Sequence, residues 1–173
     1  EEKLGCNPVY FLPYLMGERS PINDVNARGV FFGMTMDTSR ADLLQAILEG
    51  VAFAIRDSVE IAAKNGLLPE KSKICGGGAK SPLWRKIFAA VLNLPLEIPE
   101  NEQGPGIGAA LLAEAAGTGA NIRQLSREYA HASETVLPDP VLVERYEKRY
   151  QQFRKIYPAC RELFTEFAKE QEV

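Results

Sequence analysis

Apolar side chains recur every three or four positions between residues 40 and 65, which is the spacing of one face of a helix. The repeat predicts an inward stripe made of Leu43, Leu44, Ile47, Val51, Ile55, Val59 and Ala62. Ser39 with Asp42 three positions later is typical of a capping box, and Gly66 is typical of a helix end. Gly50 lies in mid-helix at a cost of about 1 kcal/mol, which predicts that another backbone segment crosses closely there.

Short strands and helices alternate after this first helix. The pattern predicts strands at 73–75 and 96–98 and helices at 82–92 and 105–116, and polar, helix-like sequence follows the last of these. This order is typical of a parallel α/β arrangement. The side chains expected to face inward from the 82–92 helix are Leu83, Trp84, Ile87, Phe88 and Val91.

The 105–116 helix is rich in small residues, namely Gly106, Gly108, Ala109, Ala110 and Ala113. Small residues allow helices to approach a neighbour closely, so we expect this helix to pack against the sheet or another helix. A longer side chain at Ala109 should then overpack the contact.

The two ends of the chain differ from its middle. Residues 1–38 form a loop-rich extension in which prolines interrupt any helix, with one strand expected at 9–12. Residues 141–173 form a charged helical tail with a break near Pro158. The tail is expected to pack on the domain surface through an apolar stripe of Tyr146, Tyr150, Phe153, Ile156 and Tyr157.

Composition narrows the class of protein. The chain has 173 residues, 46% hydrophobic and 25% charged, which is enough for one domain with its own core. A net charge of -3 argues against a nucleic-acid partner, and no segment resembles a signal peptide or a membrane span. Three widely spaced cysteines fit a reducing cytoplasm. No metal site is expected, because the single histidine, His131, has no Cys or His at ligand spacing.

Three consecutive glycines between a predicted strand and a predicted helix are the strongest candidate for chemistry. Ser81 suits the helix N-cap and Pro82 suits the first helical position, so the helix N-terminus points at the glycine turn. This geometry aims unpaired amides and the positive helix end at an anion. The predicted cofactor-binding residues are Gly76, Gly77, Gly78, Ala79, Lys80, Ser81 and Pro82. The alternatives are a tight turn that needs positive φ and, for Lys80, a merely solvated side chain.

Neither of two common phosphate-binding motifs, the Walker A motif and the dinucleotide fingerprint, describes a site in this chain. A Walker A motif would need glycines in place of Ile74 and Ala79. The run from Gly104 to Ala109 satisfies the dinucleotide pattern G-x-G-x-x-A, but the second strand and the ribose-binding acid do not follow it. We interpret that match as accidental.

Several motifs together resemble the FGGY carbohydrate kinases. Gly29-Val-Phe-Phe-Gly33-Met34, seven residues, and then Asp42-Leu43-Leu-Gln-Ala46-Ile47-Leu48-Glu49 match the signature of that family's C-terminal domain position by position. The run FLPYLMGERSPINDVNARG is most similar to the xylulose kinases of the family, and GGGAKSPLW and GPGIGAALLA follow in the family's order. The resemblance covers about residues 9–157.

The resemblance implies an α/β fold, a partial ribonuclease-H-like domain of the actin-like ATPase superfamily with additional C-terminal helices. Residues 1–173 would be the C-terminal portion of the second, nucleotide-binding domain. The N-terminal sugar-binding domain and its catalytic aspartate would precede residue 1, so no catalytic residue is assigned here. The start without methionine is interpreted as that of an engineered or proteolytic fragment. Apolar surface that the missing part would cover favours self-association, for instance as a homodimer.

The activity implied for the full-length protein is transfer of the γ-phosphate of ATP, with Mg²⁺, to a sugar hydroxyl, most of all from D-xylulose to D-xylulose 5-phosphate. The fragment alone is expected to be inactive and to meet the sugar only together with the N-terminal domain. One alternative is a gluconate or other polyol kinase of the same family. Another is a non-catalytic, actin-like nucleotide-binding module.

Other polar and aromatic positions receive weaker assignments. Related glycerol kinases use an asparagine on the adenine where this chain has Pro82, so stacking or backbone contact with the base is expected instead. Glu49 is expected to be a structural hydrogen-bonding carboxylate and Trp84 a core residue. A polar loop near the N-terminus contains Glu18, Arg19, Asp24, Asn26 and Arg28. The resemblance implies that this loop borders the cleft or braces the domain. The favoured alternative is that ion pairs, Glu18 with Arg19 and Asp24 with Arg28, simply hold the loop in place.

Overall fold

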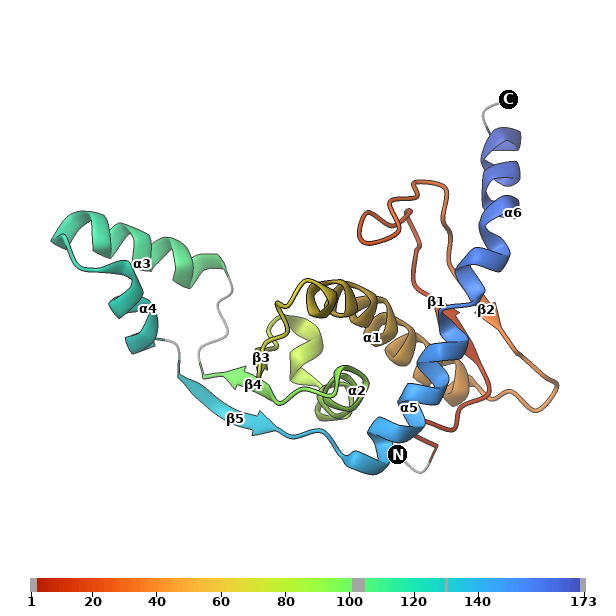
Figure 1. Ribbon diagram of the computed structural model, residues 1–173, viewed down its shortest axis with the longest axis horizontal. Helices are drawn as coiled ribbons and strands as arrows, with labels where there is room; N and C mark the ends of the chain where they lie inside the picture. The colour runs from red at the N-terminus through yellow and green to blue at the C-terminus, as the bar shows by residue number, and fades with distance from the viewer. Residues whose placement is uncertain (1–2, 101–104, 130, 172–173) are drawn as a thin grey trace.

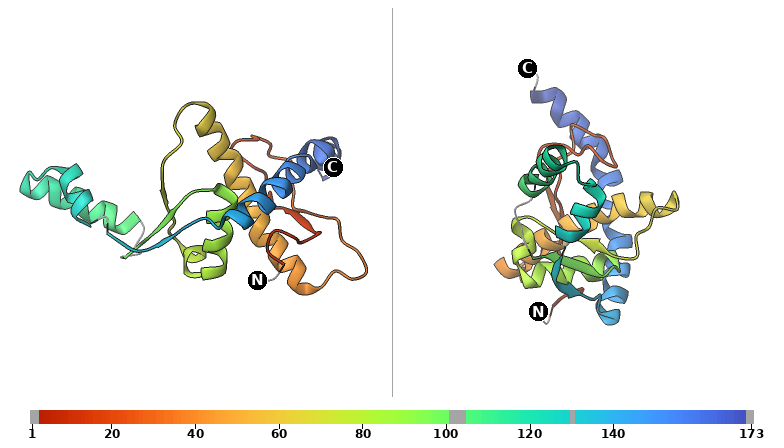
Figure 2. Two further views of the ribbon diagram at one scale, coloured as in Figure 1. Left: turned by 60° about the horizontal axis from the view of Figure 1, so that its bottom comes forward. Right: turned by 90° about the vertical axis from the view of Figure 1, so that its left-hand side faces the viewer.

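The fold is described from a computed structural model that covers residues 3–100, 105–129 and 131–171 (Figure 1). Its elements, in order, are β1 (Tyr10–Leu12), β2 (Val30–Phe32), α1 (Arg40–Lys64), β3 (Ser72–Lys73), the 3₁₀ helix η1 (Gly77–Lys80), α2 (Pro82–Leu92), β4 (Leu96–Pro99), α3 (Pro105–Thr118), α4 (Ile122–Tyr129), β5 (Ala132–Val136), α5 (Pro140–Phe153) and α6 (Ile156–Gln171). Helices α1 and α2 lie at the centre, α5 and α6 lie on one side, and α3 with α4 extends from the opposite end (Figures 1 and 2). Within the described ranges no helix is long and apolar enough to cross a bilayer.

The strands form two small sheets. In the first, β1 pairs antiparallel with β2, and in the second the order is β3-β4-β5. Strand β3 runs parallel to β4, as expected, but β5 runs antiparallel to β4, so the expected parallel arrangement is only partly right. The sequence pattern predicts neither β2 nor β5. Most of the residues of both strands are exposed, and strands without a buried face carry no clear apolar alternation.

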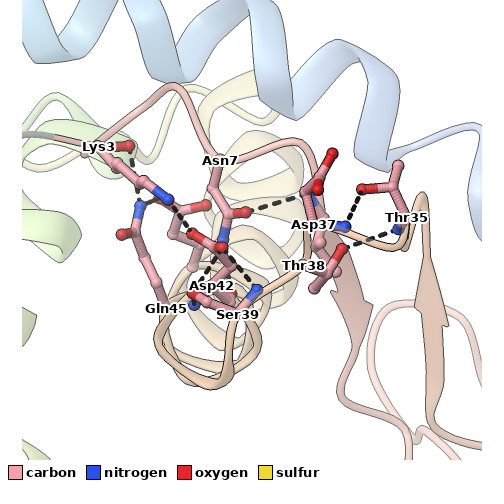
Figure 3. A network of polar contacts seen from close by, with 10 residues as sticks. Lys3, Asn7, Thr35, Asp37, Thr38, Ser39, Asp42 and Gln45 are labelled. Atoms are coloured by element: carbon pink, nitrogen blue, oxygen red, sulfur yellow. Dashed lines mark hydrogen bonds and ion pairs between the residues drawn. The ribbon is translucent and has the colours of Figure 1, made fainter.

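The start of α1 is fastened by the predicted capping box. The backbone N–H of Ser39 donates to Asp42 Oδ2 over 2.9 Å, and the N–H of Asp42 donates to Ser39 Oγ over 3.2 Å. Lys3 Nζ lies 2.9 Å from Asp42 Oδ1, and Asn7 Nδ2 donates to the Asp42 carbonyl over 2.8 Å (Figure 3). The Lys3 and Ser39 hydrogen bonds lower the pKa of Asp42 to about 2. Together these contacts tie the N-terminal segment to the helix.

The buried face of α1 differs from the predicted stripe. Leu44 is 54% exposed and Ile55 is 44% exposed, so these two predicted core positions are wrong. The residues that are buried are Asp42, Ala46, Glu49, Gly50, Ala52 and Phe53. Hydrophobic periodicity cannot find this face because two of its members, Asp42 and Glu49, are carboxylates that accept hydrogen bonds inside the protein.

The close crossing expected at Gly50 is present. A Cβ atom built on Gly50 would lie 2.1 Å from the carbonyl oxygen of Phe11, which belongs to β1. The glycine therefore lets β1 cross α1 at backbone distance.

The core joins α1 to α5 through aromatic rings. The Phe53 ring centroid lies 6.0 Å from that of Tyr146, 6.1 Å from that of Tyr150 and 5.2 Å from that of Phe153. The aromatic stripe predicted for the tail is thus confirmed. The break in the tail falls between α5 and α6, and Pro158 lies in the first turn of α6, where its missing N–H leaves no helix bond unmade.

Glu49 is the centre of a buried polar cluster. It is 1% exposed and accepts hydrogen bonds from Tyr146 Oη over 3.0 Å and from Arg149 Nη2 over 2.9 Å. Arg149 Nη2 also donates to the Val9 carbonyl over 3.0 Å, and its guanidinium lies 4.3 Å from the ring centroid of Tyr10. Glu49 therefore has the structural hydrogen-bonding role that we expected, and it connects α1, α5 and the N-terminal strand.

Helix α3 forms where it is predicted but does not pack as predicted. None of its described side chains is buried, and Ala109 is exposed. A Cβ atom on Gly106 or Gly108 would meet nothing within 4 Å. The expected close packing is therefore wrong for this chain. Figure 2 shows α3 and α4 standing away from the central helices, and a run of small residues does not reveal which surface, if any, covers it.

Candidate functional site

The glycine turn follows directly from β3. The N–H of Ile74 donates to the Glu97 carbonyl over 3.1 Å, which continues the parallel pairing beyond the end of the strand. The chain then turns at Gly76, whose φ of +90° lies in the region that glycine adopts most readily. The 3₁₀ helix η1 comes next, which the sequence analysis does not predict, and its Ala79 N–H donates to the Gly76 carbonyl over 3.0 Å. The positive φ that a tight turn requires is thus present.

Unpaired backbone amides line this turn. Within the described part of the chain, the N–H groups of Gly76, Gly77 and Gly78 have no hydrogen-bond partner. The first turn of α2 lies next to them, with Ser81 Oγ accepting from the Trp84 N–H over 3.3 Å as the predicted N-cap. Successive free amides beside a helix N-terminus form a concave surface that suits an anion.

Gly76 and Gly77 leave space in front of these amides. A Cβ atom on either residue would meet nothing within 4 Å. Pro82, at the first position of α2, is exposed. Gly76, Gly77 and Pro82 are therefore open to a ligand, whereas Ala79 is 1% exposed and anchors the loop.

Gly78 has a different environment. A Cβ atom there would lie 2.5 Å from Cζ3 of Trp84. The Trp84 indole is held in place because its Nε1 donates to the Leu48 carbonyl of α1 over 3.0 Å and its ring lies 5.5 Å from that of Phe88. Packing within the protein thus requires glycine at position 78, and Trp84 is the core residue that we expected.

Arg85 is a contributor that the sequence analysis missed. Its Nε donates to the Ala79 carbonyl, and its Nη1 lies 2.8 Å from Glu134 Oε2 on β5. The side chain therefore clamps the glycine turn to the sheet. An arginine one turn into a helix that opens on such a loop is the signal that could have found it.

Two polar side chains of the loop face solvent. Lys80 and Cys75 are exposed, and within the described ranges Lys80 has no hydrogen-bond or ion-pair partner. Lys80 thus places an uncompensated positive charge at the edge of the turn. Whether it contacts a phosphate stays a prediction.

An apolar pocket of about 420 Å³ adjoins the turn. Val51 and Ile55 of α1 form one wall, Ile74 another, and Gly78 and Trp84 a third. Part of the apolar stripe predicted to face the core therefore faces this pocket. The lining suits a flat apolar group held beside the amides.

The polar loop near the N-terminus is held differently from the prediction. Glu18 and Asp24 exchange backbone hydrogen bonds of 2.8 Å, and Tyr157 Oη donates to Asp24 Oδ2 over 2.7 Å, which lowers the pKa of Asp24. Arg28 Nη1 donates to the carbonyls of Val25 and Ala27. No ion pair forms between Asp24 and Arg28 or between Glu18 and Arg19 in the described structure. The favoured ion pairs are therefore wrong. Backbone N–H groups and Tyr157 occupy the carboxylates of Glu18 and Asp24 instead.

The remaining candidates do not form a site. Gly104, which opens the dinucleotide-like pattern, lies outside the described residues, and Gly106 to Ala109 form the first turn of α3. His131 is exposed. Among the residues that the structure describes, no three His, Cys, Asp or Glu side chains are grouped as metal ligands.

Comparison with known proteins gives the family. Residues 1–117 match the C-terminal domain of the FGGY family of carbohydrate kinases. The chain belongs to this family. The glycine turn and α2 lie inside the matched FGGY region, whereas α4, β5, α5 and α6 lie beyond it.

The relatives of this FGGY chain include sugar kinases of known structure. The xylulose kinase of Escherichia coli is 37% identical over 158 residues, which is 88% of this chain and 32% of the relative. The ligand-bound xylulose kinase of Lactobacillus acidophilus matches with a TM-score of 0.86 and 30% identity over 95% of this chain and 34% of that one. The gluconate kinase of the same species matches with a TM-score of 0.85 and 30% identity, over 95% of this chain and 33% of that one.

These matches confirm the fold class, an α/β domain of the actin-like ATPase type with extra C-terminal helices. The chain spans about a third of the length of the curated relatives that it matches.

Proposed function

We propose that this chain is the nucleotide-binding part of an ATP-dependent sugar kinase that transfers the γ-phosphate of ATP to a hydroxyl of D-xylulose, giving D-xylulose 5-phosphate. Family membership supports the reaction class, and the xylulose kinases among the relatives support the sugar. The catalytic base and the sugar-contacting groups lie, in this proposal, in the two thirds of the kinase that this chain does not span.

The observation that carries the proposal is the row of free amides at Gly76, Gly77 and Gly78 beside the N-terminus of α2. These groups suit the phosphates of ATP, because the open space at Gly76 and Gly77 lets phosphate oxygens reach the backbone. Bound Mg²⁺ would neutralise phosphate charge during transfer. Lys80 adds a positive charge at the edge of the same turn.

The remaining loop residues shape the site. Ala79 anchors the turn, Ser81 caps α2, and the exposed Pro82 offers a surface for the base, which would bind by stacking or through backbone contacts. The Pro82 side chain can neither donate nor accept a hydrogen bond, so recognition of adenine by this side chain is not proposed.

A gluconate kinase is the second candidate, because the gluconate kinase of Lactobacillus acidophilus matches this chain as well as the xylulose kinase of the same species does. The glycine turn serves the nucleotide and does not discriminate between these sugars. A non-catalytic nucleotide-binding module would differ from both in lacking a partner domain with a catalytic aspartate, which the sequence upstream of residue 1 would reveal.

Three further expectations belong to the same proposal. The three free thiols suit a reducing compartment such as the cytoplasm. The exposed apolar side chains of the 15–36 segment favour self-association of the isolated chain, for instance as a homodimer; they include Leu15, Met16, Val25, Phe32, Met34 and Met36. No binding to nucleic acid or to a membrane is proposed.

Calorimetric titration of the 173-residue chain with ATP and Mg²⁺ tests the nucleotide site. The expected result is weak, saturable binding that Gly77→Val abolishes, because the new side chain occupies open space in front of the amides without meeting protein atoms. Gly108→Val in exposed α3 is the matched control and should bind as the parent does. Equal binding by Gly77→Val and the parent would contradict the site.

A coupled assay with ATP, Mg²⁺ and D-xylulose tests the division of labour. No sugar-dependent ADP release is expected from this chain alone. Turnover at a rate near that of a full-length kinase would show that the catalytic groups lie within it.

A further inference from the structure

A second pocket lies on the face of α1 opposite the glycine turn. Its volume is about 280 Å³, and its walls come from the C-terminal half of α1, the end of α5, the start of α6 and the loop that contains Pro21. Asp57, Ile61 and Lys64 of α1 line it, whereas Val51 and Ile55, on the other side of the same helix, line the pocket beside the glycines. The two pockets are therefore separate.

Some polar groups that line this pocket have no hydrogen-bond partner among the described residues. Asp57 accepts a hydrogen bond from Tyr150 Oη over 2.6 Å at Oδ1, which leaves Oδ2 without a partner in the described residues. Tyr14 also lines the pocket and is 2% exposed, yet its hydroxyl has no hydrogen-bond partner within the described ranges. Both residues line the same pocket. Burial raises the pKa of Tyr14, and the negative charge of Asp57 adds to that increase. A hydroxyl and a half-buried carboxylate oxygen that no described residue pairs thus line the same pocket.

Aromatic rings form the apolar part of the lining. Tyr14 and Tyr157 meet edge to face with ring centroids 6.0 Å apart, and Phe153 and Tyr150 complete the aromatic walls. Tyr157 is fixed by its hydrogen bond to Asp24. The rings are therefore pre-positioned, and aromatic faces beside hydrogen-bonding groups suit molecules that have both C–H and O–H surfaces.

The charges around the pocket cancel. Asp57 and Glu60 are negative, and Lys64 and Arg154 are positive. Glu60 is already paired with Arg56, whose Nη2 lies 3.1 Å from Glu60 Oε1. Since neither sign prevails among the charged lining residues, the pocket favours neither an anion nor a cation. It instead offers both donors and acceptors to a neutral ligand.

We propose that this pocket binds a small neutral polyhydroxylated molecule of the size of a monosaccharide or a sugar alcohol. The Asp57 carboxylate accepts hydrogen bonds from its hydroxyls, the Tyr14 hydroxyl supplies a further bond, and the tyrosine rings cover its C–H surface. The site is additional to the transfer site of the proposed kinase, because it lies across α1 from the glycine turn.

An NMR titration of the ¹⁵N-labelled 173-residue chain with xylitol, without nucleotide, tests this site. Saturable shifts are expected for backbone amides around Asp57, Tyr14 and Tyr150, and not for those of Gly76 to Gly78. Because no nucleotide is present, the result is independent of whether the glycine turn binds ATP.

Two variants sharpen the test. Tyr14→Phe keeps the ring packing and removes only the unpaired hydroxyl, so xylitol affinity should fall about fivefold, the value of one neutral hydrogen bond. Asp57→Asn should weaken binding by about tenfold or more, as expected for hydrogen bonds to a charged group. Tyr10→Phe is the matched control, since Tyr10 lies outside the pocket, and it should bind as the parent does.

Three outcomes would overturn the proposal. The first is no saturable shift with xylitol. The second is unchanged affinity in folded Tyr14→Phe and Asp57→Asn, as judged by their amide spectra. The third is binding of inorganic phosphate or choline in place of xylitol, which would show that the pocket selects a charge.

Discussion

A side chain at Gly78 would collide with the indole of Trp84, because a Cβ atom there lies only 2.5 Å from Cζ3 of the ring. Gly78→Val should therefore unfold the chain more easily, by about 1–3 kcal/mol, as overpacking does. Urea denaturation followed by tryptophan fluorescence measures this loss. Gly77→Val, whose Cβ meets nothing, should keep the stability of the parent.

This pair of variants also separates packing from ligand binding. Loss of ATP binding in Gly78→Val would not locate the nucleotide, since the indole would move as well. Loss of ATP binding in Gly77→Val would locate the nucleotide at the turn, because a Cβ atom there meets no protein atoms. Equal stability of Gly78→Val and the parent would mean that the Trp84 ring is not fixed against the turn.

The crossing of β1 over α1 makes a second prediction. Gly50→Ala places a Cβ atom 2.1 Å from the Phe11 carbonyl oxygen, and backbone cannot give way as a flexible side chain does. A loss of at least about 1–3 kcal/mol is expected. Gly117→Ala, in exposed α3 with nothing within 4 Å, should not lower the stability. A chemical denaturation midpoint for Gly50→Ala equal to that of the parent would contradict the crossing.

The buried pair of Glu49 and Arg149 makes a third prediction. Arg149→Met leaves the Glu49 carboxylate inside without its cation, which should cost about 3–5 kcal/mol. Lys148→Met, one residue earlier on α5, removes only an exposed pair with Glu144 and should cause no measurable loss. Thermal denaturation at two salt concentrations checks both, and the Arg149→Met loss should hardly depend on salt, since the pair is buried.

Much of the central framework could be predicted because local chemistry determines it. The capping box of Ser39 and Asp42, the N-cap at Ser81 and the crossing at Gly50 depend on neighbouring residues or on a single conspicuous glycine, and all three are present. The aromatic stripe of α5 was predictable because its members bury large apolar areas.

The failures concern partners distant in sequence. The buried face of α1 contains Glu49, whose burial depends on Arg149, 100 positions away. In the same way, the need for glycine at position 78 depends on the Trp84 ring, which is held by the Leu48 carbonyl, 36 positions away from the tryptophan. The free amides of the glycine turn were expected, but the clamp by Arg85 depends on β5, which the sequence pattern does not reveal.

The N-terminal cluster, in which Lys3 and Ser39 bind the Asp42 carboxylate, leads to a prediction about acid stability. Hydrogen bonds from Lys3 and Ser39 lower the pKa of Asp42 from 3.8 to about 2. Because the folded chain holds this carboxylate ionised more strongly than the unfolded chain does, the cluster contributes stability that is complete above pH 3.8. That contribution is lost as the pH falls through about 2.

Urea denaturation across this acidic range measures the effect. Asp42→Asn should flatten the fall in stability within the window, and Lys3→Met should flatten it in part, because one of the donors is lost. If the parent and Asp42→Asn lose stability in parallel as the pH falls, the cluster does not hold the carboxylate in its ionised form.

Helix α3 makes the last prediction, which reverses the one drawn from its sequence. Ala109 is exposed, so Ala109→Leu has no neighbour to overpack and should leave the melting temperature of the monomeric chain unchanged. Ala90→Leu, in α2 and 1% exposed, is the control that must overpack and should cost about 1–3 kcal/mol. Scanning calorimetry at several protein concentrations, beside a sizing measurement, separates the cases. A lowered melting temperature for Ala109→Leu that appears only at high concentration would show a second copy covering this face, whereas a loss at every concentration would show that α3 packs within its own chain.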